Sequence, residues 1–308
     1  MTTSRVSRSL RQPVPASLPA PRAVLELFKP VTWFPPMWAF SCGVVSAGQA
    51  MTGRWSLVPV GLALTGPLVC GTSQAVNDWF DRHVDAINEP NRPIPSGRIP
   101  GRWGLGLAVA GTLVSLAVGL ALGWAALGAT ALALLAAWAY SAPPARLKLN
   151  GWYGNTAVGF SYEGLAWVTG AALALGGAVP PPTILAVAAL YSLGAHGIMT
   201  LNDFKSIEGD RRMGIGSLPV QLGPERAARV ACVMMLVPQL FVVALLLGRS
   251  QPLAAAVVGT VVLAQVPCMR RLLTDPRGLA PWYNATGVTL YVLGMMTTAV
   301  ALRLGTAP

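Results

Sequence analysis

Acidic side chains gather in two short segments of a chain that otherwise contains few of them. Of the eleven Asp and Glu residues in 308 positions, seven lie in these segments: Asp78, Asp81, Asp85 and Glu89 within residues 77–98, and Asp203, Glu208 and Asp210 within residues 202–212. In a helix, Asn77, Asp81 and Asp85 recur at every fourth position and therefore share one face. Carboxylates stacked in this way repel one another unless a cation joins them. Oxygen ligands of this kind suit a hard cation such as Mg²⁺, which often bridges carboxylates to phosphates.

The second segment repeats the first. The letters NDW at 77–79 correspond to NDF at 202–204, an offset of 125 residues (202 minus 77). Asp203 and Asp210, seven positions apart, also share a face if one helix continues through both. Solvated loop carboxylates are the alternative, because Asp, Asn and Pro are common in loops. The repetition favours a shared site, so we expect both segments to converge across a cavity at one end of a helical bundle.

Basic side chains flank both acidic segments. They are Arg82, Arg92 and Arg98 around the first, Lys205, Arg211 and Arg212 in the second, and Arg146 and Lys148 in the intervening stretch YSAPPARLK, 140–148. Proteins hold a diphosphate with a metal ion and with Arg and Lys, because the metal bridges the oxygens and the basic groups neutralise the remaining charge. Each of these cations, taken singly, also fits the general excess of basic residues on the cytoplasmic side of membrane proteins.

The elements that must position these groups are membrane helices. Hydrophobic residues make up 54% of the chain and charged residues 11%, and the mean hydropathy is +0.56, whereas soluble domains carry about a quarter charged residues. Nine apolar runs are each long enough to cross a bilayer as a helix: 33–51, 57–76, 104–122, 124–140, 156–178, 183–201, 228–248, 252–269 and 282–302. Pro35 and Pro36 suit a helix start, while Gln265 and Pro267 interrupt the end of the eighth run. The sequence predicts an all-α, polytopic membrane protein with nine transmembrane helices, in two related four-helix halves plus a ninth helix.

The distribution of basic residues orients this bundle. With nine spans, 19 of the 22 Lys and Arg residues fall on the side of the N-terminus and three on the other side, so the first side is predicted to be cytoplasmic. The net charge of +11 then reflects orientation and attraction to anionic lipid, not nucleic-acid binding. Residues 1–23 are rich in Pro, Ser and Arg and are predicted to form a disordered cytoplasmic arm; residues 24–308 form the membrane domain.

Three stretches of the chain resemble the motifs of a known family. The stretches NDWFDRHVDAINEPNRPIPSG (from residue 77), YSAPPARLK (from 140) and NDFKSIEGDRRMGIGSLPV (from 202) are similar to the motifs of the UbiA superfamily of intramembrane prenyltransferases. Together with KPVTWFPPMW, 29–38, they resemble the chlorophyll and bacteriochlorophyll synthase branch, and most of all the bacteriochlorophyll synthases of purple bacteria. The resemblance runs from about residue 24 to the end of the chain.

The resemblance implies roles for individual residues. The Mg²⁺ ligands would be Asn77, Asp81, Asp85, Asp203 and Asp210. The diphosphate would be bound by Arg92, Lys148 and Lys205, and the catalytic residues would be Asp81, Asp85, Lys148 and Lys205. Ser206 stands where many members of the superfamily have a further Asp, so Asp203 or Glu208 would have to compensate. Glu208 lies about 140° round a helix from Asp203 and contributes only if Gly209 breaks that helix.

The reaction implied by the resemblance joins a prenyl diphosphate to a carboxylate. Geranylgeranyl or phytyl diphosphate would esterify the propionate of bacteriochlorophyllide a and release diphosphate, the last stage of bacteriochlorophyll biosynthesis. The protein would lie in a bacterial inner or intracytoplasmic membrane with its active site facing the cytoplasm. Its partners would be these substrates and membrane lipid, with room for other pigment-pathway or photosynthetic assembly proteins. A chlorophyll a synthase or a quinone or haem prenyltransferase is the alternative within the superfamily.

No general base is expected, because a propionate is already ionised at neutral pH. His196 lies seven residues before Asp203 and is predicted to line the same cavity; His83 lies within the first acidic segment. Aromatic residues available to line a macrocycle, or simply to pack, are Tyr140, Tyr153, Tyr162, Trp152 and Trp167. A secondary transporter is the alternative from another class, but transporter sites lie near the bilayer midplane, whereas these acids follow the ends of apolar runs.

Overall fold

Helices form the regular secondary structure of this computed structural model, which describes residues 18–48, 51 and 53–305 and has no strand among them. The long helical segments are α2 (Phe34–Ser46), α3–η2–α4 (Leu57–Ala63, Leu64–Cys70 and Gly71–Asn88), α5 (Trp103–Ala121), α6 (Trp124–Ser141), α7–η4–α8 (Gly151–Gly159, Phe160–Leu165 and Ala166–Ala174), α9 (Pro182–Asn202), α12 (Pro224–Gly248), α13 (Pro252–Leu272) and α14–α15 (Pro276–Ala285 and Gly287–Leu304). The short ones are α1 (Pro21–Leu27), η1 (Pro30–Thr32), η3 (Leu147–Leu149), η5 (Asp203–Lys205), α10 (Ile207–Arg212) and α11 (Leu218–Leu222). The predicted all-α class is confirmed.

Seven helical segments in the described residues are long and apolar enough to cross a membrane. They correspond to seven of the nine predicted spans. Of the other two, α2 has 13 residues, and the predicted span continues into residues 49–50, outside the described part. The segment α7–η4–α8 is less apolar because it contains Asn155 and Glu163. Residues 1–17 of the predicted arm also lie outside the described part, and α1 begins at Pro21, within the range predicted for the arm.

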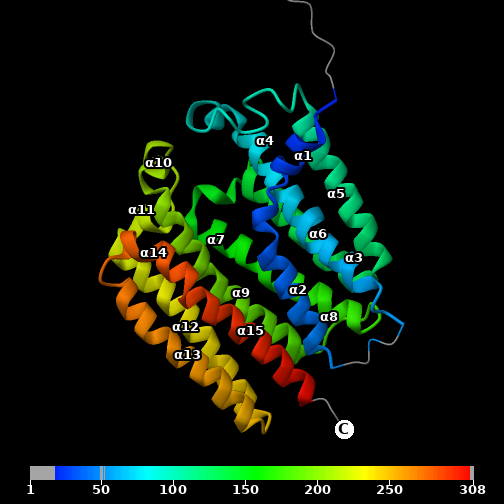
Figure 1. Cartoon of the computed structure of the whole chain (residues 1–308), viewed down its shortest axis with the longest axis vertical. Coiled ribbons are helices and arrows are strands. Elements are labelled where there is room, and N and C mark those ends of the chain that lie inside the picture. The colour runs from blue at the N-terminus through cyan, green and yellow to red at the C-terminus, as the bar shows by residue number, and fades with distance from the viewer. Residues whose placement is uncertain (1–17, 49–50, 52, 306–308) are drawn as a thin grey trace, which may run out of the picture.

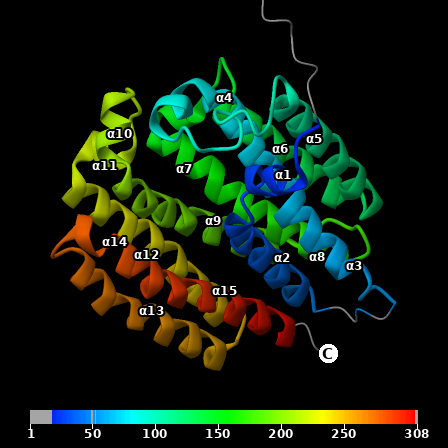
Figure 2. The same ribbon diagram turned by 45° about the horizontal axis from the view of Figure 1, so that its top comes forward.

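The helices surround a cavity, and both acidic segments lie at one end of the bundle. Figure 1 shows α1, the end of α4 and α10 in the upper part of the molecule, and Figure 2 shows the same end turned towards the viewer. The last helix, α15, packs against both α2 and α13, so it closes against the first of the long helices. The prediction that both acidic segments lie on one side is confirmed.

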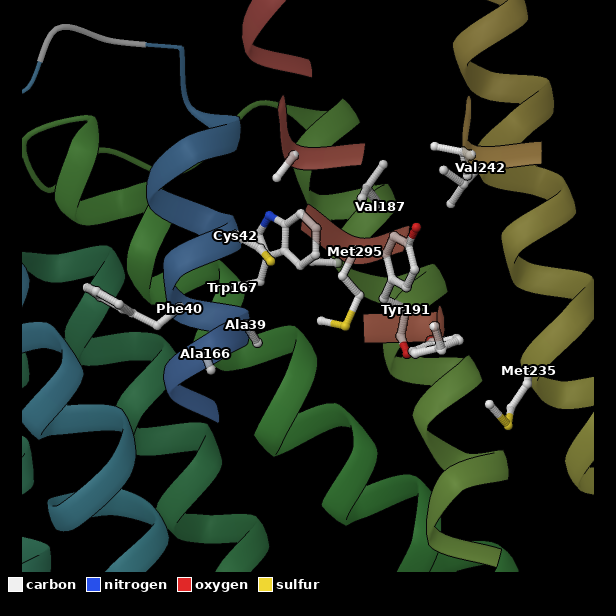
Figure 3. Packing of buried hydrophobic residues seen from close by; sticks show 14 of the residues in the cluster. Ala39, Phe40, Cys42, Ala166, Trp167, Val187, Tyr191, Met235, Val242 and Met295 are labelled. Atoms are coloured by element: carbon white, nitrogen blue, oxygen red, sulfur yellow. The ribbon is translucent and has the colours of Figure 1, made fainter. Parts of the chain in front are cut away.

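Close backbone contact holds α2 against α8. A Cβ atom added to Gly43 would lie 2.0 Å from the carbonyl oxygen of Trp167, and one added to Gly170 would lie 2.0 Å from that of Phe40. Small residues at such crossings let membrane helices approach closely, which matters because lipid gives no hydrophobic drive for their association. Trp167 is fully buried and stacks on Tyr191 at 5.7 Å between ring centroids (Figure 3). The shorter helix α2 is therefore fixed by packing.

A buried pair of amides joins α12 to α13. Gln239 donates to Gln265 at 3.1 Å, and Gln265 donates back to Gln239 at 3.0 Å. Each side chain is almost fully buried, so each amide satisfies the other in a region without water. This explains why a Gln occurs in the eighth apolar run: α13 continues through Gln265 and Pro267 to Leu272.

Candidate active site

The first acidic segment begins near the middle of α4 and continues through the end that is predicted to face the cytoplasm. The spacing of its acidic residues indicates a helix. Asn77 donates to Asp81 at 3.0 Å along the helix and to Ser141 of α6 at 3.3 Å. The helix ends at Asn88, two residues before Pro90, because a proline disfavours helical geometry in the residue before it. The predicted face of Asn77, Asp81 and Asp85 is thus formed by a single continuous helix.

Arg92 returns from the turn after α4 to the carboxylates of that helix. Its guanidinium bonds Asp85 at 2.9 Å and Asp78 at 3.4 Å, and it forms two 2.7 Å bonds with Glu89. Burial lowers the pKa of Arg92, but the hydrogen bond with Glu89 and the charges of Asp78 and Asp85 outweigh it, so the pKa is raised. Arg92 therefore remains charged beside the site.

Lys29 is a site residue that the sequence argument did not identify. Its Nζ lies 2.7 Å from Oδ1 of Asp78, whose side chain is 1% exposed. The other oxygen of Asp78, Oδ2, is buried without a hydrogen-bond partner among the described residues. Lys29 has φ +46°, a left-handed conformation uncommon for a residue other than Gly. The only sequence signal was its place at the start of KPVTWFPPMW.

Lys148 reaches the site from the loop between α6 and α7. Its Nζ forms an ion pair with Asp81, and its side chain is only 8% exposed. This loop is joined to the chain that follows α10, because Gly151 donates to the carbonyl of Gly216 at 2.7 Å and Gly216 donates to that of Leu149 at 2.9 Å. The cation predicted between the two acidic segments thus contacts the first and is anchored beside the second.

The second acidic segment is not one continuous helix, which corrects the prediction of a shared helical face. After α9 the chain forms the 3₁₀ turn η5, and α10 begins only at Ile207. The break lies at Ser206, not at Gly209, because the Ser206 hydroxyl donates to the carbonyl of Asp203 and to the carboxylate of Asp210 at 3.1 and 3.0 Å. Such bonds compete with helix continuation.

Glu208 does not compensate for the missing Asp. Its side chain is 64% exposed and faces Arg211 and Arg277 at 3.5 and 3.8 Å. Asp203, the other residue expected to compensate, accepts a hydrogen bond of 3.1 Å from Asn155 of α7. Asn155 is buried and was not identified from the sequence.

Both acidic segments surround Tyr140, at the end of α6. Asp81, Asp203 and Asp210 all lie close enough to its hydroxyl to act on it electrostatically. Lys205 is exposed, and its charge acts on Asp203. The structure thus brings together carboxylates from α4, η5 and α10 with basic groups from three loops and from η5.

A cavity of about 380 Å³ opens beneath this polar end. Asn77, Tyr140 and Asn202 line its polar end, and most of the remaining wall is apolar. The lining comes from α2, η1, η2, α4, α6, α7, η4 and α9. His196 is not among the lining residues, which corrects that prediction. It packs between α9 and α7, bonded to Thr156 at 3.1 Å and lying 5.5 Å from the Trp152 ring.

The donor set suits Mg²⁺ that is bound together with a substrate phosphate. Within residues 18–48, 51 and 53–305, no three Asp, Glu, His or Cys side chains come close enough to form a metal cluster alone. Mg²⁺, however, is usually held by one or two carboxylates together with water and substrate phosphates. The carboxylates around Tyr140, which are those of Asp81, Asp203 and Asp210, suit this arrangement.

Known proteins share both the sequence and the fold. The chain matches the UbiA prenyltransferase family over residues 34–301. It is 58% identical to the bacteriochlorophyll synthase 33 kDa chain of Cereibacter sphaeroides, covering 94% of this chain and 95% of that one. It is 38% identical to the chloroplastic chlorophyll synthase of Oryza sativa subsp. japonica, covering 90% and 76%. A UbiA homologue from Archaeoglobus fulgidus bound to DMAPP and Mg²⁺ superposes with a TM-score of 0.69 at 20% identity, covering 90% and 99%.

Proposed function

Because this chain belongs to the UbiA prenyltransferase family, we propose that it joins a prenyl group from geranylgeranyl or phytyl diphosphate to the propionate of bacteriochlorophyllide a. The observation that carries this proposal is the 58% identity to a bacteriochlorophyll synthase over almost the whole of both chains. Identity to the chlorophyll synthase is lower, at 38%, which favours bacteriochlorophyllide over chlorophyllide as the acceptor. The acidic and basic groups at the mouth of an apolar cavity support the same chemistry.

The diphosphate binds at the polar end and the prenyl chain enters the cavity. Arg92 and Lys148, paired with Asp85 and Asp81 in the free protein, turn to the phosphate oxygens together with Lys205. The carboxylates of Asp81 and Asp85, with Asn77, Asp203 and Asp210, are then available to hold Mg²⁺. Mg²⁺ held by these residues would supply positive charge that stabilises the negative charge developing on the departing diphosphate.

The reaction exchanges one C–O bond for another. The allylic C1–O bond breaks, and its electron pair leaves with the diphosphate, whose charge Arg92, Lys148 and Lys205 stabilise. A propionate oxygen donates an electron pair to C1 and forms the ester. The propionate is ionised beforehand, so no residue has to remove a proton. The apolar wall of the cavity excludes water, which would otherwise capture C1 as the free alcohol.

Purified protein in lipid nanodiscs tests this function directly. With bacteriochlorophyllide a, geranylgeranyl diphosphate and Mg²⁺, we expect ester and diphosphate in equal amounts. EDTA should abolish both products, and added Mg²⁺ should restore them. Solute flux into liposomes without ester formation would instead indicate a transporter, and ester-free consumption of the diphosphate with a quinone precursor would indicate another prenyltransferase.

The site is proposed to face the cytoplasm, because 19 of the 22 basic residues fall on its side of the predicted topology. After replacement of the four native cysteines, single cysteines at the exposed positions Arg102 and Glu225 should resist an impermeant thiol reagent in intact cells and react in inverted vesicles. A cysteine at Arg249, on the opposite side, is the matched control and should react in intact cells. The reverse labelling pattern would overturn the orientation.

A further inference from the structure

Glu163 is a buried acid that the chemistry described above does not use. It lies on η4, lines the cavity and is 7% exposed. Within the described residues its carboxyl makes no hydrogen bond or ion pair, and the groups that interact with it electrostatically are the Cys42 thiol and the Tyr291 phenol. An ionisable side chain inside a membrane is costly and is usually retained for a function.

The backbone around Glu163 is also unusual. The segment η4 is a π-helix, a rare conformation that occurs often at functional sites. A second π-helix, η2, also contributes to the cavity wall. Tyr162, next to Glu163, accepts hydrogen bonds from Cys70 of η2 at 3.2 Å and from Gln74 of α4 at 3.0 Å. The hydrogen bonds of Tyr162 thus fix the backbone beside Glu163.

The prenyl donor offers no partner for this carboxyl. Its polar atoms belong to the diphosphate, which binds among the basic groups near Asp203. Glu163 lies eight residues beyond Asn155, the partner of Asp203, and so about 12 Å deeper along the helix. The rest of the donor is hydrocarbon. Of the two substrates, only the acceptor therefore carries polar atoms that could reach this depth.

The protonation state follows from the surroundings. An isolated carboxylate in an apolar wall without a cation is costly to bury, so the neutral acid is the form that fits. A neutral acid in such a pocket donates a hydrogen bond through its O–H. The cavity of about 380 Å³ is at the small end of ligand sites. Only the edge of a tetrapyrrole that carries the propionate can enter it with the donor, and that edge carries a ring ketone and a methyl ester.

We propose that Glu163 is an acceptor-binding residue that donates a hydrogen bond from its neutral carboxyl to a carbonyl oxygen next to the reacting propionate. This proposal rests on the proposed function. It assigns to Glu163 the recognition of the acceptor and gives it no part in bond breaking.

Kinetics of Glu163→Leu and Glu163→Gln, in the full chain in nanodiscs, test this assignment. Glu163→Leu should raise the KM for bacteriochlorophyllide a at least about tenfold, because the acceptor carbonyl would then be buried without a hydrogen-bond donor. The KM for geranylgeranyl diphosphate should stay within about twofold of wild type. Glu163→Gln keeps an N–H donor and should stay within about threefold. Glu163→Met, which is unbranched and apolar, replaces Glu163→Leu if thermal unfolding shows that the latter does not fold.

Acceptor analogues identify the carbonyl. One analogue has the ring ketone replaced by a methylene group, and another lacks the methyl ester. For one of these analogues, the KM of the wild-type protein should rise by the same factor as Glu163→Leu raises the KM for bacteriochlorophyllide a. The KM of Glu163→Leu for that analogue should then rise no further. Additive losses with both analogues would overturn the proposal. A fall in kcat with both KM values unchanged would also overturn it. So would an equal rise in the acceptor KM in Glu163→Gln and Glu163→Leu, because that would indicate that the negative charge of an ionised Glu163 is what matters. Absence of ester with wild-type protein would instead refute the proposed function itself.

Discussion

Asp81→Ala is expected to lower turnover at least about 100-fold with both substrates and Mg²⁺ saturating. Asp81 is a proposed metal ligand, and loss of a ligand to an activating metal removes charge stabilisation where the C–O bond breaks. The substitution also leaves Lys148, whose side chain is 8% exposed, without its partner. Asp85→Ala should have a similar effect, because it removes a second proposed ligand and one partner of Arg92.

Two further measurements separate metal binding from folding. The concentration of Mg²⁺ needed for half-maximal turnover should rise in Asp81→Asn, which preserves the shape of the side chain but not its charge. Asp275→Asn is the matched control: Asp275 caps α14 at 3.1 Å from the Gly278 amide, away from the cavity, and Asn also serves as a helix cap. Near-normal turnover in purified Asp81→Ala or Asp85→Ala would refute the metal assignment.

Blocking the acceptor carboxylate should abolish the reaction altogether. When the bacteriochlorophyllide propionate is blocked as a methyl ester, it lacks the ionised oxygen that attacks C1. No residue of the site can restore that oxygen to the acceptor. A saturated prenyl diphosphate should bind, as competition with geranylgeranyl diphosphate would measure, and yet form no product, because it cannot form a delocalised allylic cation. Product from either analogue would contradict capture of an allylic centre by a pre-ionised carboxylate.

The same mechanism predicts little effect of histidine substitution on the chemical step. His196→Ala should keep single-turnover ester formation within about tenfold of wild type between about pH 6 and 8.5, since general-base catalysis is typically worth about 10²–10⁴-fold and none is used. A larger loss that recovers as the pH rises would show that the imidazole removes a proton, and attack by the pre-ionised propionate would then be wrong.

The parts of the fold that follow local rules were predictable from the sequence. Apolar runs determine where long helices lie in lipid, so seven of the nine predicted spans have counterparts among the described residues. The two exceptions are a 13-residue helix held by Gly43 and Gly170 and a segment that carries Asn155 and Glu163 into the bundle. Both depend on contacts with other helices, which a hydropathy pattern does not contain.

The candidate site divides in the same way. The face of Asn77, Asp81 and Asp85 follows from helical spacing alone and is present in α4. The second segment departed from its expected helix because Ser206 bonds Asp203 and Asp210 and interrupts it. Lys29 lies 49 residues from its partner Asp78, and Asn155 lies 48 residues from Asp203. Pairings at such separations arise from tertiary packing, and no local pattern reveals them.

The Gln239–Gln265 pair constrains how the protein is inserted during synthesis. A glutamine that enters lipid on a lone helix can donate only to its own backbone, as Gln239 does to Met235 at 2.7 Å, and its side-chain oxygen then has no donor, which is unfavourable in hydrocarbon. Each amide here is satisfied by the other, and only residues 249–251 separate the two helices. We therefore expect α12 and α13 to leave the translocon together as a hairpin. In a glycosylation-reporter assay, α13 should insert more efficiently behind α12 than behind α12 carrying Gln239→Leu.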